Sequence, residues 1–345
     1  MPPAQSSSDG GRDVNFAVIG SSGHAARVAA PVIDATDGAR LIGVLGSSPE
    51  RGAALAASYA GARAYGDWDE LGEDAALDAV WVAGPNHRHV EFAARCLKAG
   101  KHVLLEKPMA TTPAGAEGLL ELTSDAGPRL MVAFQHRFRP AHRWLREALA
   151  DGLVGGVKLL RIHRFWPFPY FPDMPADASL SWRSSLADSG GWALNDIGAH
   201  LIDLALWLLD THASLAFART SNFKFLDASA EDTAILLLDS DVGASITIET
   251  SNAMASFPGT IEVHGDRGWA RADGTFDGGG SIVTHTGECR TFADIAPVEA
   301  SAAALRDFLA ALGGSPAIGA TGGQAAENVA IIAAAVSAHR TQGAA

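Results

Sequence analysis

Lys107, Asp196 and His200 are the side chains of this sequence whose types and positions could do chemistry together. Lys107 follows the apolar segment 102–105 and precedes Pro108. The proline biases the lysine toward extended backbone at the carboxyl end of a strand, which is where open parallel sheets bind ligands. Asp196 and His200 are four residues apart in an apolar helix, so they share one helix face. An imidazole ordinarily has a pKa close to neutral and can give or take a proton there.

Each of these residues also has an ordinary explanation when it is taken alone. A lysine at a strand end is most often solvated, and Glu106 could serve only as its ion-pair partner. Asp196 could cap a helix, and His200 could be a core histidine that is bonded to a carbonyl group. A functional interpretation therefore depends on the other motifs of the chain.

A turn of small residues follows the first apolar segment, residues 14–19. Residues 20–25 read Gly-Ser-Ser-Gly-His-Ala and lead into an alanine-rich helix. The free N–H groups and the positive end of that helix suit a pyrophosphate. Against the dinucleotide-binding pattern G-x-G-x-x-G/A, Ser22 replaces the second glycine. On this turn alone, a dinucleotide site and an ordinary strand-to-helix turn are equally supported.

The end of the second apolar segment bears on which nicotinamide dinucleotide the turn would take. NAD sites usually place Asp or Glu at this strand end to hold the ribose hydroxyls. Here the chain reads Gly46, Ser47 and Ser48. A strand end without a carboxylate tolerates a 2′-phosphate, which Arg51 could approach, so NADP is favoured over NAD. Ser48 could at the same time cap the next helix.

Strands and helices alternate in the first part of the chain, up to about residue 135. This alternation is typical of βαβ units and of a parallel sheet that is covered on both faces. The expected strands are 14–19, 41–45, 79–83, 102–105 and 130–134, and the expected helices are 25–33, 49–59, 89–99 and 113–124.

Beyond Gln135 the pattern changes to consecutive strands. A helix at 141–150, a strand at 157–163 and a buried helix at 196–209 come first. The strand-like segments 215–220, 234–238, 244–250, 260–264 and 268–272 then follow without helices between them, and helices at 300–312 and 324–339 close the chain. The fold class is therefore α/β. After a flexible tail at 1–13, we expect a parallel-sheet domain at 14–135 and an α+β domain with a large, mostly antiparallel open sheet at 136–345.

Composition and charge exclude several classes of protein. The chain has 345 residues, too many for one ordinary domain, and 48% of them are apolar, as in globular proteins. Its formal net charge of −13 disfavours a nucleic-acid partner. The most apolar helix, 197–209, is interrupted by His200 and Asp203 and is too short to cross a bilayer. Cys96 and Cys289 support neither a disulfide framework nor a zinc site, so we expect no metal and a cytoplasmic location.

In order and spacing, these motifs resemble the Gfo/Idh/MocA family, the relatives of glucose-fructose oxidoreductase and inositol dehydrogenase. The shared features are the glycine turn, Asn86 after the fourth strand, Glu-Lys-Pro at 106–108, the pair Gly190 and Gly191, and Asp-x-Gly-x-His at 196–200. Glu-Lys-Pro alone is a weak signal. The combination is strong, and it covers nearly the whole chain from Asn15 to the last helix.

The resemblance implies a Rossmann-type nucleotide domain, followed by a domain whose open sheet covers the active site and forms homodimer or homotetramer contacts. Such proteins move a hydride between nicotinamide C4 and a carbon of a sugar, sugar derivative or polyol. Lys107, Asp196 and His200 match the catalytic positions of the family. By that match, Lys107 would polarise the oxygen, His200 would donate or accept the proton, and Asp196 would orient the substrate.

The same resemblance predicts the cofactor contacts, with NADP preferred and NAD possible. Trp182 and Arg183 resemble a pair in some NADP-using members, including 1,5-anhydro-D-fructose reductase. Residues 83–89 resemble the family's segment at the nicotinamide ribose, with Gly84 in place of the usual threonine. The predicted contacts are Gly20, Ser22, Gly23, His24, Ala25, Gly46, Ser47, Ser48, Arg51, Ala83, Pro85, Asn86, His89, Glu106, Lys107, Trp182 and Arg183.

Substrate contacts are less sharply indicated. The aromatic segment 165–172 could offer ring faces to a sugar, with Trp166 or Tyr170 near the pocket, although some of these rings could only pack. For His136 and Arg137, substrate contact and a structural role are equally supported. Two other functions stay open: a glycosidase of the same fold that keeps NAD bound and oxidises transiently, and a non-catalytic sensor that binds the cofactor.

Overall fold

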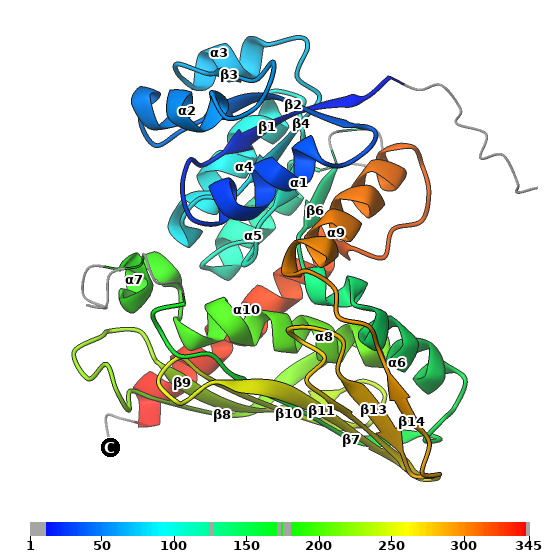
Figure 1. Ribbon diagram of the computed structural model, residues 1–345. Coiled ribbons are helices and arrows are strands. Elements are labelled where there is room, and N and C mark those ends of the chain that lie inside the picture. Colours follow the sequence, from blue (N-terminus) through cyan, green and yellow to red (C-terminus); the bar gives the residue numbers. More distant parts are fainter. Residues whose placement is uncertain (1–11, 124–126, 128, 171–173, 175–180, 343–345) are drawn as a thin grey trace, which may run out of the picture.

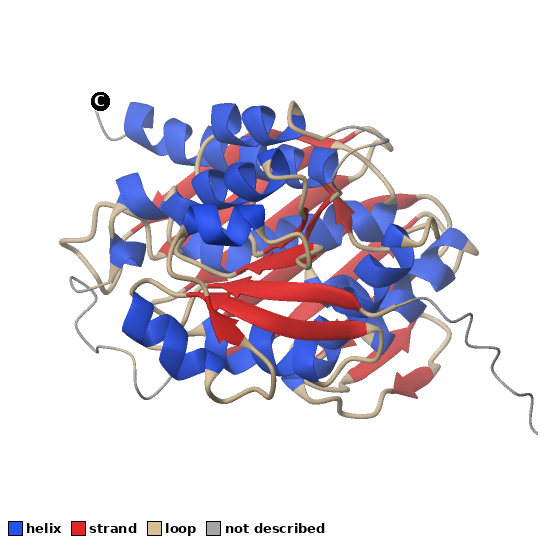
Figure 2. Cartoon of the chain, turned by 90° about the horizontal axis from the view of Figure 1, so that it is seen from above, coloured by secondary structure: helices blue, strands red, loops and turns tan. Residues whose placement is uncertain are grey.

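The computed structural model describes residues 12–123, 127, 129–170, 174 and 181–342 (Figure 1). The tail expected at 1–13 lies outside the described residues up to residue 11. Two sheets form the molecule; helices cover both faces of the first sheet, and further helices lie between the two sheets (Figures 1 and 2). The predicted fold class is confirmed.

The first sheet has the strand order of a dinucleotide-binding fold. The order is β15-β6-β5-β4-β1-β2-β3, and all pairs are parallel except β15 with β6. The chain turns back between β1 and β4, and ligands bind in such sheets at the carboxyl ends on either side of that reversal. The bounds are β1 Val14–Ile19, β2 Ala39–Leu45, β3 Arg63–Ala64, β4 Ala79–Val82, β5 His102–Leu105, β6 Leu130–Val132 and β15 Ala320–Thr321.

Both faces of this sheet are buried, because successive strand residues point into different clusters. Phe16 and Val18 pack in one cluster, and Ala17 and Ile19 pack in the other. This explains why the strand reads as a continuous apolar run. On one face lie the π turn η1 Ala25–Ala29 with α1 Ala30–Asp34, α2 Pro49–Ala56 and α9 Pro297–Leu312, and on the other lie α3 Trp68–Glu73, α4 His89–Lys98 and α5 Pro113–Leu120.

The second sheet has eight strands in the order β14-β13-β12-β11-β7-β10-β9-β8, and all neighbours are antiparallel except β7 and β10. One face carries residues such as Ile162 and Ile248, which pack against helices. The bounds are β7 Val157–Phe165, β8 Ala213–Ser221, β9 Thr233–Ser240, β10 Ser245–Ser251, β11 Phe257–Gly265, β12 Trp269–Asp273, β13 Ser281–Thr284 and β14 Cys289–Thr291.

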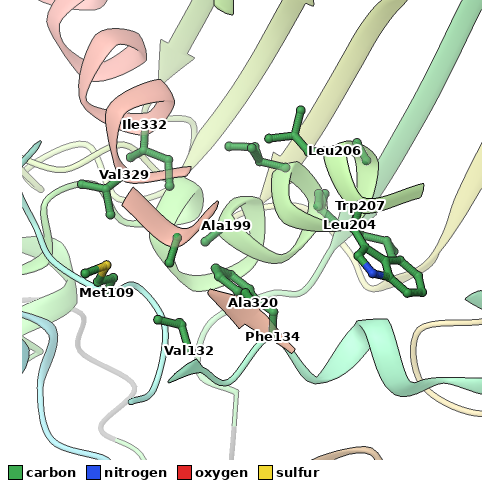
Figure 3. Close-up of a cluster of buried hydrophobic side chains, with 14 of the residues drawn as sticks. Met109, Val132, Phe134, Ala199, Leu204, Leu206, Trp207, Ala320, Val329 and Ile332 are labelled. Carbon is green, nitrogen blue, oxygen red and sulfur yellow. The ribbon is translucent and has the colours of Figure 1, made fainter. Parts of the chain in front are cut away.

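The helices between the sheets join the two halves into one core. They are α6 Pro140–Ala150, the π turn η6 Leu194–Gly198 that continues as α8 Ala199–Leu209, and α10 Gly322–Gln342. Figure 3 shows Met109 and Val132 of the first half together with Leu204 of α8 and Val329 of α10. None of the described helices is both long enough and apolar enough to span a membrane.

The end of the chain returns to the first sheet, which the expected boundary at residue 135 does not allow for. Strand β15 pairs with β6, and Leu305 and Phe308 of α9 pack beside Phe16. The expected second domain, 136–345, therefore includes a segment that completes the first. Short strands such as β15 leave little hydrophobic periodicity from which this return could be predicted.

Candidate active site

A cavity of about 430 Å³ between the two sheets brings the three predicted catalytic side chains together. The first sheet contributes residues that follow β1 and β5, and the second domain contributes β7 and the helix formed by η6 and α8. Small-molecule sites commonly lie at such domain junctions. The predicted residues that line it are His24, Glu106, Lys107, His136, Trp166, Tyr170, Arg183, Asp196 and His200.

The ammonium group of Lys107 is held by main-chain carbonyls of the second domain. Its Nζ donates to the carbonyl oxygens of Asn195 at 3.2 Å and of Asp196 at 2.9 Å. An ammonium has three N–H groups, so one is left for an oxygen in the cavity. Burial lowers the pKa of Lys107, while the nearby Asp196 and Glu106 oppose that shift.

The helix that carries Asp196 and His200 begins as a wide π turn. Within η6 the N–H of Ala199 donates to the carbonyl oxygen of Leu194, five residues earlier. Such turns are rare and occur frequently at functional sites. The carbonyls that accept from Lys107 belong to this turn, so its geometry and the position of the lysine depend on each other.

Asp196 is fixed by donors from the aromatic segment. The Tyr170 hydroxyl donates to Oδ2 at 2.7 Å, and Trp192 Nε1 donates to the Tyr170 oxygen at 3.1 Å. Arg183 Nε lies 3.1 Å from the same carboxylate oxygen. Burial and the adjacent negative charge raise the pKa of Tyr170 well above its usual value, so its hydroxyl stays protonated and keeps donating.

His200 also lines the cavity and is nearly buried, with 8% of its surface exposed. Its ring stands almost perpendicular to that of His136, and their centroids are 4.8 Å apart. Burial and the positive charge of Lys107 lower the pKa of His200 well below its usual range, so the imidazole is neutral at pH 7. Among the described residues, Nδ1 of His200 has no hydrogen-bond partner. A neutral imidazole can accept a proton from an alcohol.

Glu106 connects the strand before Lys107 to the glycine turn. Its Oε1 accepts from Trp81 Nε1 at 3.2 Å and lies 2.9 Å from His24 Nε2. Burial alone would raise the pKa of Glu106, but His24 and Lys107 hold it below its usual range. The charged carboxylate therefore keeps the start of the first helix beside Lys107.

The turn after β1 has a backbone that suits a pyrophosphate. Gly20 has a φ of +127°, and a Cβ at this position would lie 2.9 Å from the Ala83 carbonyl oxygen, so a side chain does not fit. The Gly20 backbone thus packs against Ala83, so the carboxyl ends of β1 and β4 lie together, and Pro85 comes shortly after β4. Ser22 and Gly23 are exposed in front of the buried Ala25, and nothing lies within 4 Å of a Cβ built on Gly23.

The turn after β2 is packed tightly and held to the glycine turn. A Cβ at Gly46 would collide with the backbone nitrogen of Gly52, so the strand end and α2 are in contact. The N–H of Ser47 donates to Ser21 Oγ at 3.4 Å. Ser48 Oγ accepts from the N–H of Arg51 at 3.4 Å, which confirms that Ser48 caps the helix. The Arg51 side chain is exposed beside this turn.

Two residues of the segment after β4 have structural partners. Asn86 Nδ2 donates to the Ser189 carbonyl at 3.3 Å. The ring nitrogens of His89 lie 2.7 Å from the Pro108 oxygen and 2.9 Å from the Gly84 oxygen, and the residue is 1% exposed. The sequence predicts that His89 contacts the cofactor, but its buried ring nitrogens already face two carbonyls. His89 instead positions the segment that carries Lys107.

The pair Trp182 and Arg183 forms one turn at the edge of the cavity, η5 Trp182–Ser184. The Arg183 guanidinium stacks 4.3 Å from the Trp182 ring centroid. Only Arg183 lines the cavity, whereas Trp182 lies against His87, with 6.3 Å between the ring centroids. Trp182 thus holds the arginine side chain that reaches Asp196.

Arg137 does not line this cavity, contrary to the expectation of a substrate contact. Its guanidinium forms two hydrogen bonds to Asp203, at 2.9 and 2.6 Å, and both side chains are only 3% exposed. It also donates to the Ile318 carbonyl at 3.1 Å and to Gln324 Oε1 at 3.0 Å. Arg137 therefore joins three segments of the chain, which is the structural role that the sequence left open.

Several lining residues belong to no motif and were missed. They are Arg139 before α6, Arg164 on β7, and Phe276 and Asp277 after β12. The only sequence signal was Arg164, which occupies the same inward face of β7 as Ile162. Charged residues are seldom buried unless they are paired, so an arginine at an apolar position of a strand indicates a binding or pairing role. No cluster able to hold a metal ion occurs among the residues that the structure describes.

The buried histidines make the stability of the fold depend on pH. Burial lowers the pKa of His142 to about 3, and its ring is bonded to His136 O and Thr275 Oγ1. An unfolded histidine titrates near about 6.5. Below that value the unfolded chain binds a proton that the folded chain does not. The contribution of His142 to the free energy of unfolding is therefore fully present above pH 6.5 and is lost as the pH drops toward 3.

We therefore expect His142→Asn to weaken the pH dependence of the free energy of unfolding. Between pH 6 and 4, the slope should fall by up to about 1.4 kcal/mol per pH unit. Urea unfolding at several pH values measures it, and His264→Asn, at an exposed site on β11, is the control. Parallel curves for the wild type and the His142 variant would contradict the assignment.

Comparisons with known proteins come from both sequence and structure. Residues 14–134 match the family model described as an oxidoreductase family with an NAD-binding Rossmann fold, GFO_IDH_MocA. Residues 142–271 match the model of the GFO/IDH/MocA C-terminal domain. The two matched segments follow the same order as the two sheets.

Relatives with similar sequences include sugar and inositol oxidoreductases, and a solved structure has a similar fold. The chain is 33% identical to inositol 2-dehydrogenase 2 of Saccharopolyspora erythraea over 68% of this chain and 66% of that protein. It is 31% identical to 1,5-anhydro-D-fructose reductase of Ensifer adhaerens over 59% of each. These matches span just under two thirds of the first relative and less of the second. A levoglucosan dehydrogenase in complex with NADH and L-sorbose superposes with a TM-score of 0.84 at 22% identity, covering 96% of this chain and 98% of that one.

Proposed function

Because the chain belongs to the Gfo/Idh/MocA family of oxidoreductases, we propose that it transfers a hydride between NADP(H) and a carbon of a sugar, sugar derivative or polyol. The supporting observation is that Lys107, Asp196 and His200 share one cavity beside the glycine turn. Asp196 and His200 face the same space as Lys107, which disfavours a purely regulatory role.

The chain offers a place for each part of such a cofactor. The pyrophosphate would bind at the helix N-terminus after Gly20, where nothing lies within 4 Å of a Cβ built on the exposed Gly23. Ser47 and Arg51, in the turn after β2, would contact the adenosine ribose. Glu106 and Arg183, which line the cavity, would lie near the nicotinamide. When it is bound, the nicotinamide would supply the hydride donor or acceptor.

The residues of the chain would handle the oxygen and its proton. Lys107 has one N–H left to donate to the substrate oxygen, which stabilises negative charge there. Neutral His200 would accept the hydroxyl proton during oxidation and return it during reduction. Asp196, held by Tyr170 and Arg183, would orient the neighbouring hydroxyl groups.

A titration and a product analysis test this function together. NADPH fluorescence should change on addition of the protein, and a screen of carbonyl sugars and polyols should show coupled oxidation or reduction of the nicotinamide at its absorbance maximum. If neither NADPH nor NADH bound, the proposal would be rejected. Cleavage of a glycosidic bond without net change of the cofactor would instead identify the glycosidase.

Substitutions in the turn after β2 test the proposed preference for NADP. Arg51 is the cation of this turn, whereas Glu50 is the neighbouring carboxylate, with a pKa lowered by its hydrogen bond to Ser48. We expect Arg51→Ala to raise the KM for NADPH about 10-fold and to change the KM for NADH little, because one charge-assisted contact to a phosphate is lost. Preference of the wild type for NADH, weakened by Glu50→Gln, would reverse the assignment.

We also propose that the open face of the second sheet joins copies of this chain in a homodimer or homotetramer. Phe217, Ile235 and Trp269 are large apolar residues exposed on this face, at 49%, 45% and 39%. The strand registers place all three opposite the helix-covered side. A monomeric mass from light scattering at micromolar concentration would contradict this interface.

A further inference from the structure

Two arginines of the second domain are buried in the wall of the cavity. Arg139 and Arg164 are 4% and 6% exposed, and both line the cavity beside His136 and His200. Neither takes part in the chemistry proposed above. A buried guanidinium is costly unless a negative charge compensates it, so the partners of these two cations decide what they do.

Among the residues that the structure describes, one carboxylate pairs with these two cations. Arg164 Nη2 pairs with Asp277 Oδ1, and the Asp277 side chain is 57% exposed. Arg139 Nε donates to His136 Nδ1 at 3.3 Å and Nη1 donates to the Gly278 carbonyl at 3.5 Å. Within the described part of the chain, no carboxylate lies within ion-pair distance of Arg139. The cluster of Arg139, Arg164 and Asp277 therefore keeps one net positive charge.

The surroundings preserve this charge rather than cancel it. The Arg164 guanidinium lies 4.9 Å from the Trp166 ring centroid and 5.5 Å from that of Phe276, which supports a cation without neutralising it. Burial and the charge of Arg164 lower the pKa of Arg139 to about 10, so it still carries its charge at neutral pH. The whole chain has a net charge of −13, so a positive cluster in its cavity is a local feature.

We propose that Arg139 and Arg164 bind a carboxylate of the substrate, so that the substrate is a sugar acid such as an aldonate or a uronate. The inference rests on the proposed function and names its substrate class. One net positive charge matches a monoanionic carboxylate better than a dianionic phosphate ester. Planar guanidinium groups also match the paired oxygens of a carboxylate.

The position of the pair separates it from the cofactor phosphates. The predicted pyrophosphate turn follows β1 in the first sheet, whereas Arg139 and Arg164 come from the second domain. Arg139 contacts His136, whose ring lies against His200. A substrate with its carboxylate on the arginines would therefore extend toward His200 and Lys107, where its reacting carbon is required.

Matched pairs of substrates test the inference. D-gluconate against D-glucitol, and D-glucuronate against D-glucose, differ mainly in the carboxylate. We expect kcat/KM to favour the acid by about 10- to 100-fold, the range of one or two charge-assisted hydrogen bonds. Arg139→Gln should reduce this ratio at least about 10-fold. Arg290→Gln, at an exposed arginine on the edge strand β14 of the same sheet, should keep it.

A variant that is expected to tighten binding of the acid distinguishes loss of the site from misfolding. Asp277→Asn removes the competing carboxylate at an exposed position, so it should tighten binding of the acid about 3- to 10-fold, and a damaged fold cannot produce that gain. Isothermal titration with D-gluconate, with and without NADP⁺, measures this affinity independently of turnover.

The outcomes are distinguishable from those of the proposed function. If NADPH binds but neutral sugars are preferred, or Asp277→Asn weakens binding of the acid, the carboxylate site is overturned while the oxidoreductase function stands. Preference for D-glucose 6-phosphate over both acids would also overturn it. If neither NADPH nor NADH binds while D-gluconate binds and responds to both variants, the anion site stands and the oxidoreductase function fails.

Discussion

Replacing Lys107 with methionine is expected to lower kcat at least about 1000-fold, because electrostatic stabilisation of the reacting oxygen depends on this ammonium group. Its Nζ already donates to two carbonyls of the π turn and has one N–H left for the substrate. Methionine keeps the length and the apolar part of the side chain but has no donor. The expected change in the Kd for NADPH is less than about 3-fold, since the phosphate turn is untouched.

Two measurements separate this catalytic role from a structural one. Lys158→Met changes an exposed lysine at β7 and should leave kcat unaltered. The thermal midpoint of Lys107→Met should stay close to that of the wild type, which would show that the loss of turnover does not come from unfolding. Turnover of the Lys107 variant within about 10-fold of the wild type would remove the lysine from the mechanism.

Replacing Arg137 with methionine is expected to lower the free energy of unfolding by about 3 to 5 kcal/mol, since it leaves Asp203 buried and unpaired. Burial raises the pKa of Asp203 even in the presence of the arginine. The same change also frees the Ile318 carbonyl and the Gln324 side chain, which belong to the returning end of the chain. Urea unfolding followed by circular dichroism measures the loss.

A second variant distinguishes an unpaired charge from lost packing. In Arg137→Met with Asp203→Leu, both charges are replaced by apolar groups, so the combined loss should be smaller than the loss from Arg137→Met alone. Arg290→Met, which breaks an exposed pair with Glu288, should cost at most about 1 kcal/mol. Equal losses from the buried and the exposed arginine would contradict the role assigned to Arg137.

The sequence was sufficient for the fold and for the three polar residues at its centre. Strands β1 and β5 begin and end where their apolar runs do, because both faces of a parallel sheet are buried and little else produces so short and continuous a run. Proline after Lys107 and the spacing of Asp196 and His200 predicted side chains that meet in one cavity. Taken singly, each of these residues also had an ordinary explanation, so their joint role was predicted only from the combination of motifs that resembles the family.

Other parts of the site depend on contacts between distant segments. Arg137 and Arg139 are two residues apart, yet one pairs with Asp203 and the other lines the cavity, and nothing in their own sequence separates them. The ring of His89 is fixed by carbonyls of residues 84 and 108, which only the fold brings together. The pairing of β15 with β6 spans nearly 190 positions of the chain, from Val132 to Ala320.

The return of the chain to the first sheet also restricts how the cavity can open. The backbone passes between the two halves after β6, before α9 and again at the start of α10. Two domains joined by a single backbone connection can rotate freely about it, but three connections prevent most of these rotations. Arg137 ties the first and last links together. A ligand should therefore enter and leave the proposed site by small side-chain displacements, for example of the partly exposed Trp166, rather than by a large rotation of one half.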